Sequence, residues 1–159
     1  MLYATNGLPP PDQTGRFAGV FVCSAGRLPA IPAHTGSNVY AVDTASDATF
    51  ACRIACACKC VHDIYWSDDD AHVLLANGPA PTSPVDALTF AVAYAMYASD
   101  KTLAQAHALV QQTCDIQFEM DPRHRSALAA HDPGVGPTLW RLVHDVHPTT
   151  GTLVPPSPK

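Results

Sequence analysis

Residues 85–99 constrain the fold most strongly, because apolar side chains occupy every side of the helix that they predict. Ser83 or Pro84 begins this helix, and Asp86 lies in its first turn, where a carboxylate interacts favourably with the helix dipole. Its large apolar side chains are Leu88, Phe90, Val92, Tyr94, Met96 and Tyr97. A helix that is apolar all round is a buried one. We therefore expect the core to be centred on this helix and on the next predicted one, 101–114, which Asp100 would cap.

The remaining pattern predicts an α+β protein, mostly helical, with a small N-terminal β element. Two short runs rich in Val, Phe and Tyr, 17–23 and 38–42, are the strand candidates. Further helices are predicted from Ser46 or Asp47 to about Lys59, from Asp121 to about Ala130, and over 138–147, whereas residues 61–66 favour strand. We expect one globular domain over 1–148 and a flexible, proline-rich tail over 149–159.

The charge and the apolar pattern limit the class of protein. The net charge of −5 gives no general electrostatic footprint for nucleic acid, although Arg123, His124 and Arg125 could form a local basic patch, so nucleic acid stays open as a partner. No stretch approaches the roughly 20 apolar residues of a membrane span, and residues 1–11 lack the pattern of a signal peptide. We expect a cytoplasmic protein if the chain is full-length, or a module exported as part of a larger protein.

Four of the six cysteines lie close together, as Cys52, Cys56, Cys58 and Cys60, and His62 follows them. Thiolates and imidazole are zinc ligands, so these five side chains are a candidate metal site with zinc as the expected ion. Two other interpretations fit the same spacing. The cysteines could form disulfides or carry out redox chemistry, or they could be small hydrophobic residues in a buried, alanine-rich helix.

The C-terminal region contains a second candidate site. His144 and His147 are three residues apart on the predicted helix 138–147, Asp145 lies between them, and His131 precedes the helix. Imidazoles at this spacing can share a metal ion, and a carboxylate can orient a ring or bind the ion. These four residues therefore suggest a metal-dependent hydrolase or nuclease. The alternative is a set of surface histidines at a helix C-terminus, where an imidazolium interacts well with the dipole.

Glu119 completes the catalytic candidates. In an extended segment Gln117, Glu119 and Asp121 would share one face, and paired carboxylates can act as base and stabiliser. The Gln-x-Glu doublet at 117–119 also resembles one element of the arginine-directed ADP-ribosyltransferases, although the arginine expected after Leu2-Tyr3 is absent. The alternative is an exposed polar strand or turn.

A second resemblance covers residues 51–60. The string Ala-Cys-Arg-Ile-Ala-Cys-Ala-Cys-Lys-Cys resembles the cysteine-rich junctions that precede C-terminal toxin modules in PAAR- and Rhs-type secreted bacterial effectors. The resemblance implies an exported antibacterial domain, for example a nuclease, with a neutralising immunity protein as its partner.

Two classes of function follow from these patterns. The first is a small effector (toxin) domain with metal-dependent hydrolase activity. The second is a non-enzymatic module that binds a metal or a protein, in which the cysteine segment is structural. An ADP-ribosyltransferase-like enzyme is a further alternative.

Overall fold

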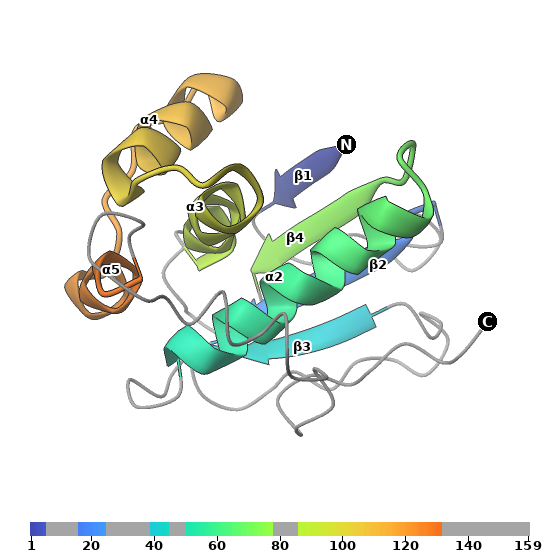
Figure 1. Ribbon diagram of the computed structural model, residues 1–159, viewed down its shortest axis with the longest axis horizontal. Coiled ribbons are helices and arrows are strands. Elements are labelled where there is room, and N and C mark those ends of the chain that lie inside the picture. Colours follow the sequence, from blue (N-terminus) through green and yellow to red (C-terminus); the bar gives the residue numbers. More distant parts are fainter. Residues whose placement is uncertain (6–15, 25–38, 45–49, 78–85, 132–159) are drawn as a thin grey trace.

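The computed structural model describes residues 1–5, 16–24, 39–44, 50–77 and 86–131 of the chain. These residues form a sheet and several helices (Figure 1). The strands are β1 (Leu2–Thr5), β2 (Gly19–Ser24), β3 (Val39–Asp43) and β4 (Val73–Asn77), and the helices are α2 (Phe50–Ser67), α3 (Asp86–Ser99), α4 (Leu103–Cys114) and α5 (Pro122–Ala129). The predicted α+β class, with more helix than strand, is confirmed.

The sheet has the strand order β1-β4-β2-β3, and every neighbouring pair is parallel. β2 and β3 lie close to the strands predicted at 17–23 and 38–42, whereas neither β1 nor β4 is predicted from the sequence. β4 is a continuous apolar run, as is typical of strands that are buried on both faces of a parallel sheet. β1 is a short strand whose position comes from its pairing with β4, with Leu2 opposite Val73.

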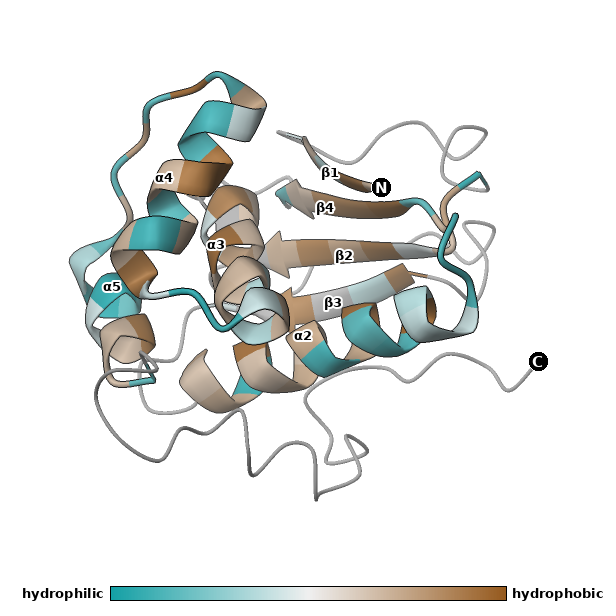
Figure 2. Ribbon diagram, turned by 45° about the horizontal axis from the view of Figure 1, so that its top comes forward, coloured by the Kyte–Doolittle hydropathy of each residue, from teal (hydrophilic) through white to brown (hydrophobic). Residues whose placement is uncertain are grey.

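Both faces of the sheet carry apolar side chains, because successive residues of a strand point to opposite faces. The strand residues of the larger core cluster are Phe21, Cys23, Tyr40, Val42, Val73 and Leu75, and those of the second cluster are Val20, Val22, Val39 and Leu74. In the larger cluster Phe21 stacks on Tyr40, with ring centroids 4.7 Å apart, and also meets Phe90 of α3. Figure 2 shows the hydrophobic strands beside the helices that cover one face.

Helices α2 and α3 pack against each other on one face of the sheet (Figures 1 and 2). α2 continues to Ser67, so the expected end near Lys59 and the strand preference of residues 61–66 are both wrong. Packing explains the difference, because Ile54, Cys58 and Val61 are all buried in the core, and this burial outweighs the β propensity of the later residues.

Helices α3 and α4 form the expected hairpin. α4 begins with a capping box, in which the Thr102 hydroxyl accepts a hydrogen bond from the Gln105 amide and the Gln105 side chain accepts one from the Thr102 amide. Asp100, the cap predicted from the sequence, lies before this box with a φ of 54°. The correction follows from chemistry, because Thr102 and Gln105 together satisfy two amide groups that Asp100 alone would not.

Helix α5 matches the short helix predicted from Asp121, which is its N-cap, with Pro122 as its first residue. The predicted helix 138–147 and the tail 149–159 lie outside the described residues. Among the helices that the structure describes, none combines the length and the apolar character needed to cross a membrane.

Candidate functional site

The carboxyl ends of the four strands lie at one edge of the sheet, because the strands are parallel. Helix α5 lies beyond this edge, past the arrowheads of the strands in Figure 1. Open parallel sheets bind their ligands just outside the carboxyl ends of the strands. Three polar residues are buried in this region: Thr44 follows β3, Asn77 ends β4, and His124 belongs to α5.

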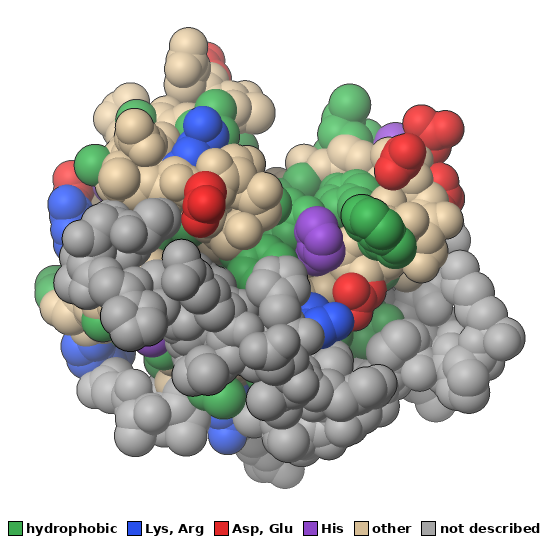
Figure 3. Space-filling view, viewed as in Figure 1, with side chains coloured by type: hydrophobic (Ala, Val, Ile, Leu, Met, Phe, Trp, Pro, Cys, Tyr) green, Lys and Arg blue, Asp and Glu red, His purple; other side chains and the backbone are tan. Residues whose placement is uncertain are grey.

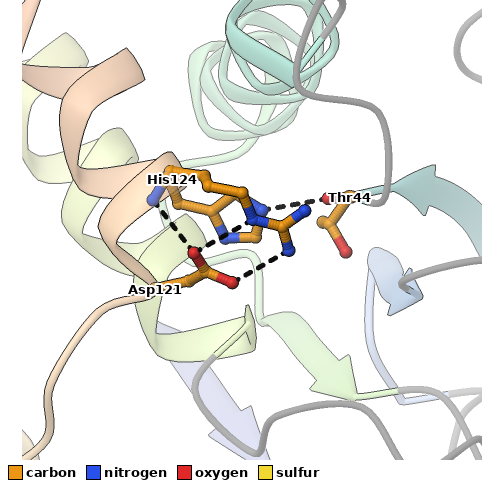
Figure 4. A network of polar contacts seen from close by, with 4 residues as sticks. Thr44, Asp121 and His124 are labelled. Atoms are coloured by element: carbon orange, nitrogen blue, oxygen red, sulfur yellow. Dashed lines mark hydrogen bonds and ion pairs between the residues drawn. The ribbon is translucent and has the colours of Figure 1, made fainter.

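His124 connects α5 with the end of β3 and the start of α2. Its Nε2 atom donates a hydrogen bond to the carbonyl oxygen of Thr44 at 2.9 Å (Figure 4). Its ring stacks on the ring of Phe50, the first residue of α2, with centroids 4.0 Å apart. The side chain is 3% exposed. One hydrogen bond and one ring stack therefore fix the orientation of this imidazole.

The contact with Thr44 also determines the tautomer of His124. A carbonyl oxygen only accepts hydrogen bonds, so Nε2 carries the proton, and in the neutral ring Nδ1 has the lone pair. Nδ1 is buried, and no hydrogen-bond partner reaches it in the structure described. Most buried polar atoms in native proteins are satisfied. An oriented imidazole with an unshared lone pair is the arrangement that a general base or a metal ligand needs.

Asn77 holds the start of α3 at the same edge. Its Oδ1 atom accepts a hydrogen bond from the backbone amide of Ala87 at 2.8 Å in buried surroundings. Ala87 lies in the first turn of α3, where amide groups have no partner within the helix. Since α2 begins at Phe50 beside His124, the N-terminal ends of two helices lie at this edge, and their dipoles favour negative charge there.

Asp121 and Arg123 form an ion pair next to His124 in sequence (Figure 4). The Arg123 side chain donates to both carboxylate oxygens of Asp121, and the Arg123 amide donates to one of them. These hydrogen bonds, the side-chain ones first, lower the pKa of Asp121 to about 2. The carboxylate is therefore ionised at neutral pH and caps α5.

The cysteine segment does not converge on one point. All six cysteines lie in described ranges, and none of them forms a disulfide there. Cys56 and Cys58 are buried, Cys60 is partly buried and Cys52 is exposed, because successive residues of a helix point to different sides. Within the described residues, no three His, Cys, Asp or Glu side chains are placed to hold a metal ion. A zinc site at these cysteines and His62 stays a prediction.

Burial keeps two of these thiols protonated. It raises the pKa of Cys60 to about 11, with a further contribution from Asp63 and Cys56. Burial likewise raises the pKa of Cys58 well above its ordinary value. The thiolate is the form that binds metals and attacks disulfides. Cys56 and Cys58 belong to the core cluster and Cys60 packs against it, which fits the interpretation of these three as small hydrophobic residues, whereas Cys52 is exposed.

The structure describes only some of the predicted catalytic residues. His144, Asp145 and His147 lie outside the described residues. Glu119 is exposed before α5, and His131 follows α5, where burial lowers its pKa. The eight residues of α5, about 12 Å long, lie between these two positions in the chain. A joint role of Glu119 and His131 stays a prediction.

An apolar pocket of ≈ 170 Å³ lies between β1, α3 and α4. Its lining includes Leu2, Ala91, Leu109 and Val110, and it contains no histidine and no carboxylate. The ionisable groups of this lining are the phenols of Tyr3 and Tyr94 and the thiol of Cys114, and we take the carboxyl edge, with its buried histidine, as the better candidate site.

The chain matches no family model, no curated protein and no solved structure. Its function has to be inferred from the site itself. The sequence patterns did not single out Asn77, and they included His124 only in a basic patch. The one available signal was a polar residue directly after an apolar strand, as at Thr44 after β3 and at Asn77 in β4.

Proposed function

We propose that the protein is a small effector domain with hydrolase activity, and that His124 acts as its general base at the carboxyl edge of the sheet. One observation carries the proposal: the buried Nδ1 atom of His124 meets no hydrogen-bond partner among the described residues, while the Thr44 carbonyl holds Nε2. A general base must be unprotonated on the nitrogen that meets the substrate, and it must be held in orientation. The hydrogen bond to Thr44 supports the second condition, and the neutral ring would supply the first at Nδ1.

The surroundings of His124 suit a reaction in which negative charge develops. The N-terminal ends of α2 and α3 lie at this edge, and helix dipoles stabilise an oxygen that becomes negative when an ester or phosphodiester is hydrolysed. Arg123 is engaged by Asp121, so we assign it to the capping of α5. The effector character rests on the resemblance of residues 51–60, which also implies an immunity protein as partner.

A metal-dependent form of this hydrolase is compatible with the same atom. Nδ1 of His124 could bind zinc, and the predicted metal ligands His144, Asp145 and His147 lie outside the described residues. Both forms of the proposal need Nδ1, so one substitution tests both.

The alternative role of His124 is purely structural. The ring is buried, so a substrate reaches Nδ1 only after the side chains that cover it move aside. His124→Gln distinguishes the two roles, because the glutamine amide nitrogen can take the place of Nε2 and donate to Thr44, while no basic nitrogen replaces Nδ1. The matched control is His107→Gln, because His107 Nε2 also contacts a backbone oxygen, that of Phe118 at 3.0 Å, away from the edge.

The test is growth of a bacterial host that expresses each variant, with circular dichroism on the purified proteins. We expect the wild type and His107→Gln to inhibit growth, and folded His124→Gln to have lost about 100-fold or more of its activity. A folded His124→Gln variant with full toxicity would overturn the role of His124. A harmless wild type would contradict the effector proposal itself. Loss of toxicity in folded His144→Ala, with His124→Gln still active, would move the site to the C-terminal histidines.

A further inference from the structure

The C-terminal end of α2 presents an aromatic surface at the end of the sheet opposite to His124. Trp66 is 83% exposed, more than the other exposed large hydrophobic residues in the described ranges. One turn earlier, His62 lies between it and α3, with its ring 6.3 Å from Trp66 and 5.8 Å from Tyr97. We call these three residues the aromatic face. Exposed tryptophan and tyrosine are typical of binding surfaces, because they combine a large apolar ring with a polar group.

Acidic residues adjoin the aromatic face in the chain. Asp68, Asp69 and Asp70 follow α2 directly and are all exposed, and Asp63 is exposed on the preceding turn. Lys59, the nearby cation on α2, is paired with Asp63 at 3.0 Å. The last turn of α2 contains no basic residue that would compensate the negative end of the helix dipole. Figure 3 shows acidic side chains beside a histidine and hydrophobic side chains on this side of the molecule.

We propose that the aromatic face and the acidic residues 68–70 form a docking surface for a basic segment of a protein partner, with an arginine side chain placed over the indole of Trp66. A guanidinium group is attracted by the face of a tryptophan ring, and its planar shape stacks on it. The neighbouring carboxylates attract the same cation and steer its approach. The charge of this surface therefore selects a basic occupant and repels an anionic one such as nucleic acid.

This inference is independent of the proposed hydrolase activity. α2 runs away from the carboxyl edge, since Phe50 contacts His124 and Ser67 lies near the start of β4 (Figure 1). Substitutions at Trp66 therefore leave the His124 site unchanged, and binding can be measured whether or not the protein has enzymatic activity.

Two variants remove the surface without disturbing the fold. Trp66→Ala deletes an indole that is mostly exposed. Asp69→Asn combined with Asp70→Asn removes two charges and leaves Asp68, whose Oδ1 accepts a hydrogen bond from the Asp70 amide. The matched control combines Asp115→Asn with Glu119→Gln, which removes the same charge from exposed residues between α4 and α5. Asparagine is tolerated at position 115, where φ is 51°.

The experiment measures binding of a fluorescent peptide of alternating arginine and glycine by fluorescence anisotropy, at low and at physiological salt. We expect the wild-type protein to bind this peptide, more weakly at high salt, and not to bind the same peptide with glutamate in place of arginine. Trp66→Ala and the Asp69/Asp70 double variant should each raise Kd about fivefold or more, and the control double variant less than about twofold.

Three outcomes would overturn the proposal. The first is a wild-type protein that does not bind the arginine peptide. The second is an unchanged Kd for folded Trp66→Ala. The third is an equal loss of binding in the Asp115/Glu119 control, which would show that only the net charge of the protein matters.

Discussion

The ring of His124 stacks on the ring of Phe50, with an angle of 8° between the two planes. This contact joins α5 to the first residue of α2, and it places the imidazole where Nε2 reaches the Thr44 carbonyl. The carboxyl edge of the sheet is therefore held together by contacts of the His124 side chain with the Phe50 ring of α2 and with the backbone of the residue that follows β3. Loss of the stack should weaken the whole edge.

Phe50→Ala tests this dependence. Phe50 is buried, and truncation of a buried phenylalanine to alanine lowers the free energy of unfolding by about 3–5 kcal/mol. We expect this loss in urea unfolding followed by circular dichroism. Phe50→Leu serves as control, because it keeps most of the buried volume and should cost less. Nearly equal stabilities for the wild type and Phe50→Ala would show that the contact with His124 does not hold the edge.

The cysteines allow a prediction about reactivity. Cys52 and Cys114 are exposed, so a thiol reagent at neutral pH should modify them first in the native protein. Cys60 should react slowly, because burial raises its pKa to about 11, and Cys58 only after denaturation. Peptide mapping after a short pulse of iodoacetamide would identify the labelled positions.

A metal measurement complements the thiol reaction. If the cysteines only pack in the core, elemental mass spectrometry on protein purified without a metal-affinity tag should find much less than one zinc per chain. About one zinc per chain, with Cys58 protected even in denaturant until a chelator is added, would contradict the packing interpretation.

The free energy of unfolding should fall at alkaline pH. Burial raises the pKa of Cys60 to about 11 and those of Tyr40 and Tyr94 to about 12, above their ordinary values of 9.0 and 10.0. Above about pH 9 the unfolded chain therefore loses protons that the native protein retains, so the native state becomes less favoured as the pH rises towards 12. Below about pH 7 these groups are protonated in both states and contribute no pH dependence.

Urea midpoints measured between about pH 8 and about pH 11 would show this decline. Cys60→Ala removes one of the groups and should reduce the slope between about pH 9 and about pH 11. A midpoint that stays constant over this range in the wild type would show that the buried thiol and phenols do not ionise as expected.

Several elements were predictable because their signals are local. The apolar residues of α3 required burial, and Asp121-Pro122 marked the start of α5. The Val- and Phe-rich runs indicated β2 and β3. β1 and β4 were not predictable in the same way, because parallel strands pair with residues far away in the chain, and a strand buried on both faces shows no alternation of apolar and polar residues.

The segment with the most unusual composition is not the one that contains the candidate site. The cysteine segment stands out by its density, and its Cys56 and Cys58 side chains are buried in the core while Cys52 is exposed. Residues 61–66 favoured strand by propensity, and packing on the sheet made them helical. The contacts that α2 makes with β2, β3 and α3 therefore outweighed the strand propensity of residues 61–66.

The sequence by itself determined that α3 had to be buried and that the chain would contain more helix than strand. It also determined that Asp121 would cap a helix. These features depend on residues within one or two turns of each other. Only the tertiary structure decided that Thr44, Asn77 and His124 lie at one edge. Parallel pairing brings the carboxyl ends of distant strands together, and α5 closes over them through the contacts of His124 with Thr44 and Phe50. Such long-range contacts are formed by burial and hydrogen bonding in the folded core, and local propensities contain no information about them.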